Sequence, residues 1–195
     1  LGFLLLALAV STEGSIEAFT FYLVQYTMTN VNTFMTLLAF GYMSKGIISS
    51  HKNTNVREFA LLDDLKGQFY QNPLLAISFA ISLFSMAGIP PLMGFFAKQM
   101  VLYSVSYNYS FIAIVAILTS VISASYYLKI VQLMFFSKDS VNTAANNTVE
   151  QDTPNVTTMH SSIIAVITMV ISLYLFDPSI LLNACHLLSL SLFTV

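Results

Sequence analysis

Lys98 is the residue whose type and position point most directly to chemistry. It follows the apolar stretch SMAGIPPLMGFFAKQM, Ser85 to Met100, which has two prolines and two glycines ahead of its one charged side chain. A lysine deep in a lipid-embedded segment costs about 2.5 to 3.5 kcal/mol to insert, so it must be paired, hydrated or neutral. An amine that gains and loses a proton at such a depth is typical of a proton relay. We therefore interpret Lys98 as a candidate relay; the alternative is a lysine that snorkels to an interface.

The residues before Lys98 predict a broken helix. The apolar segment 73–107 has about 35 residues, which as one straight helix would measure about 52 Å, well beyond a hydrocarbon core of about 30 Å. Pro90 and Pro91 remove backbone donors, while Gly88 and Gly94 allow conformations that other residues resist. We expect the helix to break at Gly88–Pro91, and such breaks at membrane depth commonly mark ion sites. A proline kink that serves packing alone is the alternative.

Polar residues elsewhere could line a path beside the lysine. The stretch QYTMTNVNTF places Gln25, Thr27, Asn30 and Thr33 at helical spacings, and Lys129 lies in the later segment SVISASYYLKI. The uncharged side chains could hold water, or they could bond to neighbouring helices. Lys129 could snorkel to the nearer interface or take part in a relay on that side.

The sequence predicts no cofactor or metal site in this chain. The single cysteine, Cys185, excludes an internal disulfide and a cysteine-based metal cage, and we expect it to be a small buried hydrophobe. The three histidines have no metal-ligand spacing, and no glycine-rich phosphate loop or nucleophile-base pair is present. We expect no redox centre here.

The composition is that of an integral membrane protein. Hydrophobic residues make up 56% of the 195 residues and charged residues 8%, against about 25% charged in soluble domains. Mean hydropathy is +0.77. With seven Lys and Arg in all and a net charge of -2, the chain lacks the basic field needed to bind nucleic acid, which we exclude as a partner.

The hydrophobic pattern predicts an all-α bundle that forms a single transmembrane domain over residues 1–195. The first ten residues, LGFLLLALAV, are about half of a span and are interpreted as the tail of a helix that begins upstream. We expect four full transmembrane helices after this partial one, because none of the long apolar runs alternates as strands would. Their approximate ranges are Ile16 to Ser44, Pro73 to Tyr107, Phe111 to Ser137, and Ser161 to Phe176 or a little beyond.

Two long loops set the expected orientation. Residues 45–72 and 138–160 separate the helices on one side, and six of the seven cations lie in or beside them: Lys45, Lys52, Arg57, Lys66, Lys129 and Lys138. The positive-inside rule puts both loops in the cytosol or the mitochondrial matrix and the C-terminus on the opposite side. The first loop also predicts a short amphipathic interfacial helix, with Phe59, Leu62, Leu65 and Phe69 on its apolar face.

The stretches LFSMAGIPPLMGFFAKQMVLY and VISASYYLKIVQLMFF give the chain a family resemblance. Together with the start LGFLLLALA and the loop DDLKGQFYQNP, they resemble the NADH dehydrogenase subunit 2 family, antiporter-like membrane subunits of mitochondrial respiratory complex I. The resemblance covers most of the chain. It implies fourteen helices built from two inverted five-helix repeats, of which this chain would supply part of helix ten and helices eleven to fourteen.

The resemblance also implies a role for Lys98, which matches the lysine of the family's broken twelfth helix, one of a row of buried charges linked to proton pumping. The family's glutamate of helix five and lysines of helices seven and eight would lie upstream, so we expect this chain to hold an incomplete proton path. Flavin, iron-sulfur clusters and quinone would belong to other subunits. The expected partners are the N-terminal half of the same subunit, other membrane-arm subunits and lipids.

We therefore expect a proton-translocating subunit of NADH:ubiquinone oxidoreductase, multi-pass in the mitochondrial inner membrane, with its long loops in the matrix and its C-terminus in the intermembrane space. Two alternatives stay open. One is a subunit of an Mrp-type sodium/proton antiporter, which shares the broken-helix pattern. The other is a structural fragment of the membrane arm that moves no protons.

Overall fold

The fold is helical throughout the described part of the chain. It is taken from a computed structural model, which describes residues 1–50, 65–107, 109–136, 158–174, 176 and 178–193. Within these residues there is no strand, as the apolar runs predicted. The helices are α1 (Gly2–Val10), α2 (Glu13–Ser50), α3 (Gln68–Gln71), α4 (Pro73–Ala87), α5 (Met93–Ser106), α6 (Ser110–Phe136), α7 (Thr158–Leu173) and α8 (Ser179–Phe193).

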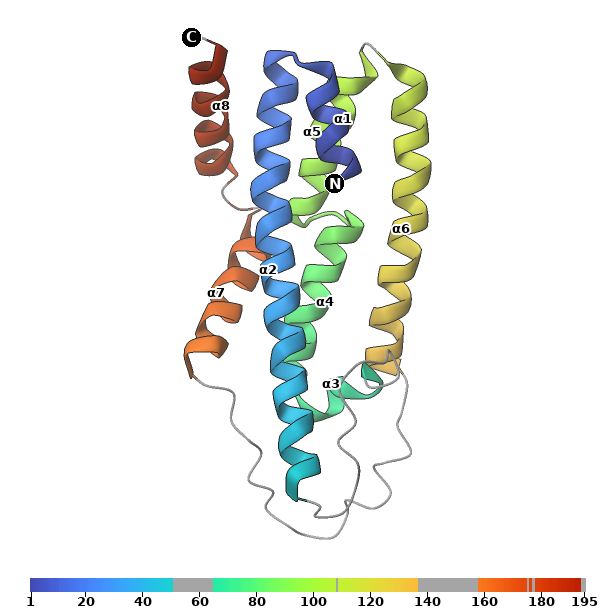
Figure 1. Cartoon of the computed structure of the whole chain (residues 1–195), viewed down its shortest axis with the longest axis vertical. Helices are drawn as coiled ribbons and strands as arrows, with labels where there is room; N and C mark the ends of the chain where they lie inside the picture. The colour runs from blue at the N-terminus through green and yellow to red at the C-terminus, as the bar shows by residue number, and fades with distance from the viewer. Residues whose placement is uncertain (51–64, 108, 137–157, 175, 177, 194–195) are drawn as a thin grey trace.

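Helix α2 is the element around which the others are arranged (Figure 1). It packs against α1, α4, α5, α7 and α8. Its 38 residues correspond to about 57 Å of helix, so it is longer at both ends than the predicted span of Ile16 to Ser44 and exceeds the thickness of a bilayer core.

The predicted long segment 73–107 consists of two helices. Helix α4 ends at Ala87 and α5 begins at Met93, and they follow one another along the length of the bundle (Figure 1). The gap therefore contains Gly88, Pro90 and Pro91, and Gly94 lies in the first turn of α5. The prolines explain the gap, because neither can donate the backbone hydrogen bond that would continue α4.

The last segment is also interrupted, which the hydrophobic pattern did not predict. Instead of one span near Ser161 to Phe176, α7 ends at Leu173 and α8 runs from Ser179 to Phe193. Pro178 precedes α8, and its carbonyl accepts the backbone hydrogen bond of Leu182 at 3.2 Å. A proline at this position suits a helix start but cannot continue an incoming helix. In Figure 1 this gap and the gap between α4 and α5 lie at similar heights.

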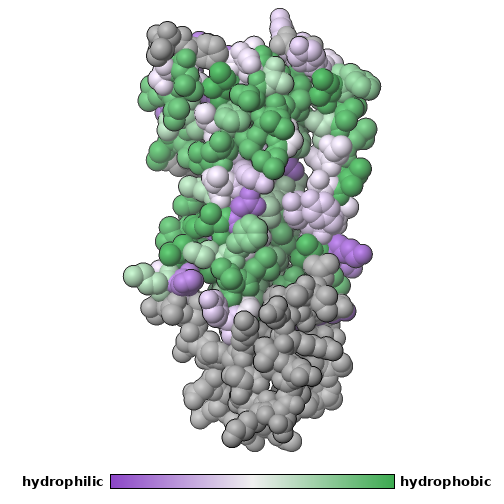
Figure 2. All heavy atoms as spheres, in the orientation of Figure 1, coloured by the Kyte–Doolittle hydropathy of each residue, from purple (hydrophilic) through white to green (hydrophobic). Residues whose placement is uncertain are grey.

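These interruptions change the expected count of four full spans. Among the described residues, α6 is the one helix that is long and apolar enough to cross a membrane by itself, with 27 residues. Helices α4, α7 and α8 are shorter apolar helices, and α2 is too polar along its length to meet the same criterion. Figure 2 shows apolar side chains over much of the described surface on one face.

Two apolar clusters form the core. The first joins α1, the beginning of α2, α5 and α8, and it includes Cys185, which is buried as predicted. The second joins the later part of α2 to α4 and α6 and contains Phe40, Phe79 and Met134. Outside the two clusters, the buried side chains of α2 and α4 are mostly polar: Gln25, Thr29, Asn32, Thr33, Thr36, Ser78, Ser82 and Ser85.

The predicted amphipathic helix falls largely outside the described residues. Phe59 and Leu62 lie in the range 51–64, which the structure does not describe. Of the other two, Leu65 is buried in the second cluster, and the ring of Phe69 in α3 stacks on that of Phe135, with 4.6 Å between centroids. This short helix therefore packs on the loop-side ends of α4 and α6.

Candidate functional site

The end of α4 has a capping geometry that depends on the glycine at position 88. Gly88 adopts the left-handed conformation, with φ of 84°, and its N–H donates to the carbonyls of Phe84 and Ser85. The N–H of Ile89 also donates to Phe84, at 3.1 Å. This pattern is a Schellman motif, which uses carbonyls in the last turn of α4. The Ala87 carbonyl is left for another donor.

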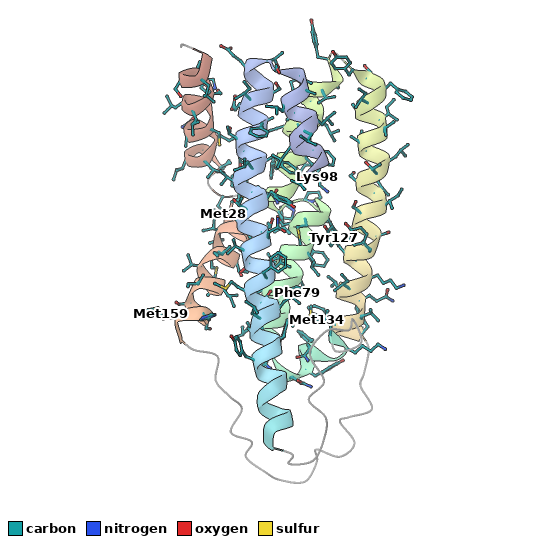
Figure 3. All side chains as sticks on the ribbon, viewed as in Figure 1. Met28, Phe79, Lys98, Tyr127, Met134 and Met159 are labelled. Carbon is teal, nitrogen blue, oxygen red and sulfur yellow. The ribbon has the colours of Figure 1, made fainter. Side chains whose placement is uncertain are left out.

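Lys98 supplies that donor. Its Nζ donates to the Ala87 carbonyl at 2.9 Å and lies 5.7 Å from the centre of the Phe3 ring. The side chain is half-buried, and Figure 3 shows it at the level of the gap between α4 and α5. An ammonium group is favoured at the C-terminal end of a helix dipole and over an aromatic face. The C-terminal end of α4 thus binds the ammonium group of a lysine that belongs to α5, the second half of the interrupted segment.

No carboxylate of the described residues pairs with Lys98. Glu13 and Glu17 lie in the first turns of α2, and Glu17 instead contacts His186 of α8, with 3.2 Å between Oε2 and Nδ1. The attraction that holds the Lys98 amine among these residues therefore comes from a carbonyl and a ring rather than from an opposite charge. Such contacts can hold an ammonium group without fixing it in a permanent ion pair.

Ser85 connects three helices beside the lysine. Its fully buried hydroxyl accepts hydrogen bonds from the amide of Gln25 in α2, at 3.4 Å, and from the N–H of Gly94 in α5, at 3.2 Å. The second bond satisfies a free N–H in the first turn of α5. A Cβ at Gly94 would overlap the Ser85 carbonyl oxygen, so this close approach requires glycine.

A small polar pocket lies next to the amine. It has a volume of about 50 Å³ and is lined by Tyr22, Gln25, Tyr26, Ser85, Met86, Lys98 and Tyr127. A cavity needs about 10 to 15 Å³ of this kind to hold one water, so there is room for a few. The lining offers hydroxyl and amide groups that can both donate and accept. The arrangement can therefore pass a proton between Lys98 and bound water.

The structure brings together only some of the residues predicted to line the site. Gln25 reaches the pocket, whereas Thr27 is exposed and Asn30 half-exposed on other faces of α2. Thr33 is buried, but its hydroxyl donates to the Thr29 carbonyl of its own helix. Lys129 is exposed on α6 and does not line the pocket.

Sequence reasoning missed the serines of α4 and the three tyrosines of the pocket. A signal was present, because Ser78, Ser82 and Ser85 recur at spacings of four and three and so share one face of a helix. The tyrosines come from α2 and α6, and Figure 3 shows Tyr127 on α6 beside the gap region. Their approach to Lys98 depends on how these helices pack, which the sequence pattern alone does not give.

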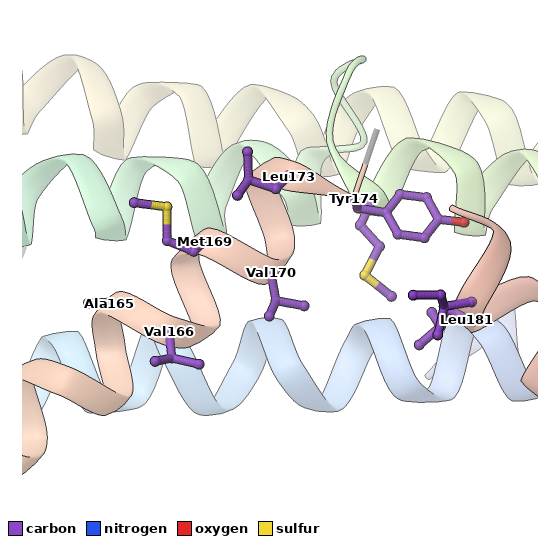
Figure 4. Close-up of a pocket in the computed structure, with 9 residues that line it drawn as sticks. Ala165, Val166, Met169, Val170, Leu173, Tyr174 and Leu181 are labelled. Carbon is purple, nitrogen blue, oxygen red and sulfur yellow. The ribbon is translucent and has the colours of Figure 1, made fainter. Parts of the chain in front are cut away.

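A larger cavity at the second interrupted helix has a different character. It measures about 620 Å³ and is lined by Met93 of α5 and by residues of α7, α8 and their junction, including Val166, Met169, Val170 and Leu181 (Figure 4). No charged side chain lines it. Its chemistry fits hydrocarbon rather than an ion.

Comparison with known proteins gives a consistent result. The family model described as NADH:quinone oxidoreductase/Mrp antiporter, TM, matches residues 1–123. NADH-ubiquinone oxidoreductase chain 2 of Rhizopus oryzae is 46% identical over 98% of this chain, which spans 39% of that protein. NADH-quinone oxidoreductase subunit N of Hydrogenovibrio crunogenus is 36% identical over 73% of this chain, which spans 28% of that protein.

The fold also matches a solved structure. A chain of respiratory complex I from Thermus thermophilus with bound aureothin aligns with a TM-score of 0.63 and 22% identity, over 92% of this chain and 36% of that one. At this identity the match supports the fold alone. Because the family model covers well over half of the sequence, the chain belongs to the NADH:quinone oxidoreductase/Mrp antiporter transmembrane family.

Proposed function

We propose that this chain is part of an antiporter-like membrane subunit of NADH:ubiquinone oxidoreductase in the mitochondrial inner membrane, and that Lys98 relays protons there. The observation that carries the proposal is the half-buried Lys98 amine at the end of an interrupted helix, beside a pocket with room for water. Family membership supports this reading, as do relatives named as subunits of NADH-ubiquinone and NADH-quinone oxidoreductases.

The proposed step is a proton exchange at Nζ. The Ala87 carbonyl and the Phe3 ring stabilise the ammonium form, while water in the pocket can accept its proton and return one. A charged neighbour outside this chain would drive the exchange, since the described residues offer Lys98 no carboxylate. The chain spans about two fifths of the Rhizopus relative, so the remainder of the subunit is the expected source of that charge. Flavin, iron-sulfur clusters and quinone would reside in other subunits.

The proposed membrane arrangement follows the cations. Helices α2 and α6 would each span the bilayer, and α4 with α5 and α7 with α8 would span as interrupted pairs. The loops that contain residues 51–64 and 137–157 would face the matrix, and the end of α8 would face the intermembrane space. Lipid and other membrane-arm subunits would cover the apolar outer face of α6, which includes Phe111, Leu118 and Ile122.

Purification of the tagged chain from its native membrane tests the assignment. We expect it to bring down flavin and iron-sulfur subunits together with NADH oxidation by a quinone acceptor. The family description also names Mrp antiporters, and that alternative predicts sodium-dependent proton exchange in vesicles without NADH oxidation. A purely structural role predicts instead that polar substitutions in the bundle change the amount of assembled complex but never proton transport alone.

A further inference from the structure

A second buried polar cluster lies along α2 from the Lys98 pocket. The amide nitrogen of Asn32 donates to Ser82 Oγ at 2.7 Å and to Thr168 Oγ1 at 3.1 Å, and Ser78 Oγ bonds to the same Thr168 hydroxyl. The cluster joins α2, α4 and α7. Asn32 and Ser82 have no exposed surface, and Ser78 is also buried.

Two hydroxyl groups of this cluster donate to backbone carbonyls of their own helices. Ser82 donates to the Ser78 carbonyl at 3.0 Å, and Thr168 donates to the Ile164 carbonyl at 2.6 Å. With their hydrogens directed at these carbonyls, both hydroxyls accept from the Asn32 amide nitrogen, which lies towards them. If the amide were rotated by 180°, its oxygen would face these hydroxyls, and its N–H groups would lose both acceptors.

This orientation leaves the amide oxygen without a donor. Asn32 Oδ1 is buried and has no hydrogen-bond partner, and it is the one buried side-chain atom in that state within the described residues. A buried acceptor left unpaired costs about 1 to 3 kcal/mol. Since Asn32 has no exposed surface, a group from another polypeptide could reach Oδ1 only by separating the helices. Internal waters commonly satisfy such buried atoms in proteins.

We propose that an internal water donates a hydrogen bond to Asn32 Oδ1. We also propose that this water extends a polar track, the row of buried polar side chains between α2 and α4 that begins at the Lys98 pocket. The inference rests on the proposed function for its role in proton transfer. On α2 the track runs from Gln25 to Asn32, seven residues or about 10 Å of helix. The buried Thr29 lies between them, and its hydroxyl donates to the Gln25 carbonyl of its own helix at 2.9 Å.

The matching positions on α4 show the direction of this track. Ser85 contacts Gln25, and Ser82 contacts Asn32, so the two polar contacts lie one after the other between the same pair of helices. The second contact is farther from Lys98 and nearer the end of the bundle at which α4 and α7 begin. The water thus extends the polar track from the lysine towards the end of the bundle at which α4 and α7 begin.

High-resolution electron cryomicroscopy of the assembled complex tests the site directly. We expect a water peak at about 2.7 to 3.2 Å from Asn32 Oδ1 in the unsubstituted complex and its loss in Asn32→Leu. A protein group bonded to Oδ1, or no density beside it, overturns the proposal. So does a sodium ion at the site, recognised by turnover that depends on sodium in the unsubstituted complex but not in Asn32→Leu.

Proton transport in proteoliposomes tests the role of the track. We expect Asn32→Leu and the milder Thr168→Val to cause a several-fold loss of NADH-driven proton transport in assembled complex. Asn183→Leu on the exposed face of α8 and Thr119→Val on the exposed face of α6 are matched controls that we expect to leave transport unchanged. If proton transport is unchanged in Thr168→Val and in any assembled Asn32→Leu complex, the polar track has no role in proton transport. The water peak does not depend on Lys98, so its absence contradicts this inference without touching the proposed relay.

Discussion

Lys98 is held by its own interrupted helix. Its amine contacts the last free carbonyl of α4 at Ala87, while its backbone belongs to α5. A cation at a helix C-terminus gains about 0.3 to 1 kcal/mol at exposed positions, and an exposed cation–π contact about 0.5 to 1 kcal/mol. These contributions are small compared with the cost of burying a charge. The contacts therefore position the amine but do not by themselves offset the cost of keeping it charged.

Gly88 has two roles: it adopts the left-handed backbone conformation that ends α4, and it leaves space for the Lys98 side chain. Two substitutions separate these roles. An added Cβ would lie 3.0 Å from Lys98 Cδ, and φ of 84° disfavours any residue except glycine or asparagine. We expect Gly88→Ala to cost about 1 to 2 kcal/mol from backbone strain alone and to lower both complex stability and proton transport. Gly88→Asn should recover stability but not transport, because its Cβ still crowds the lysine. Full transport by an assembled Gly88→Asn complex would contradict this reading.

Gly94 should be intolerant of any side chain. In Gly94→Ala the new methyl group would overlap the Ser85 carbonyl, so α5 must move away from α4. We expect a loss of about 1 to 3 kcal/mol or more, typical of overpacking, measured as a lower thermal unfolding midpoint or reduced assembly. Gly14→Ala is the control, since a Cβ there meets nothing within 4 Å. Equal stability of the two variants would rule out the close approach.

At the scale of the elements, the sequence predicted one of the two helix interruptions and not the other, because the residue types around them differ. Pro90 and Pro91 predicted the gap after α4 because they lie in the middle of an overlong apolar segment. The gap before α8 was missed because Asn183 and His186, which lie within α8, lower the hydropathy beyond Pro178, so this part of the sequence does not stand out as a second apolar helix.

The lining of the pocket was only partly predictable for a geometric reason. From Gln25, a helix turns about 200° to Thr27 but returns to nearly the same face at Thr29 and Asn32. The sequence shows the polar residues but not which face meets α4. Burial of Thr29 and Asn32, with exposure of Thr27, settles the choice.

The three-helix contact at Ser85 predicts a specific loss of stability. In Ser85→Ala the Gln25 amide and the Gly94 N–H lose their acceptor. We expect this to cost about 1 to 3 kcal/mol, the usual range for leaving a buried polar group unpaired, seen as a lower unfolding midpoint of the purified complex. Ser104→Ala is a suitable comparison, because that hydroxyl donates only to the Val101 carbonyl of its own helix. If both variants unfold at the same temperature, Ser85 does not join the helices.

At the scale of the whole molecule, the interior contains buried polar side chains as well as two apolar clusters. The polar side chains lie where α2 and α4 meet α5 and α7, close to the gap after α4. Apolar side chains cover the outer face of α6, where Ile114, Leu118 and Val121 are exposed. The bundle thus presents hydrocarbon-compatible surface outside and keeps its hydrogen-bonding groups inside, as a protein in a membrane must.

The central claim is that Lys98 relays protons, and the proton-to-electron ratio of Lys98→Met tests it most directly. The measurement uses assembled complex in proteoliposomes, with NADH oxidation and proton uptake recorded together. We predict a lower ratio or a matching fall in turnover at normal assembly, whereas Lys129→Met, which removes an exposed lysine of α6, should behave as the unsubstituted complex. An unchanged ratio and unchanged turnover in Lys98→Met would contradict the account.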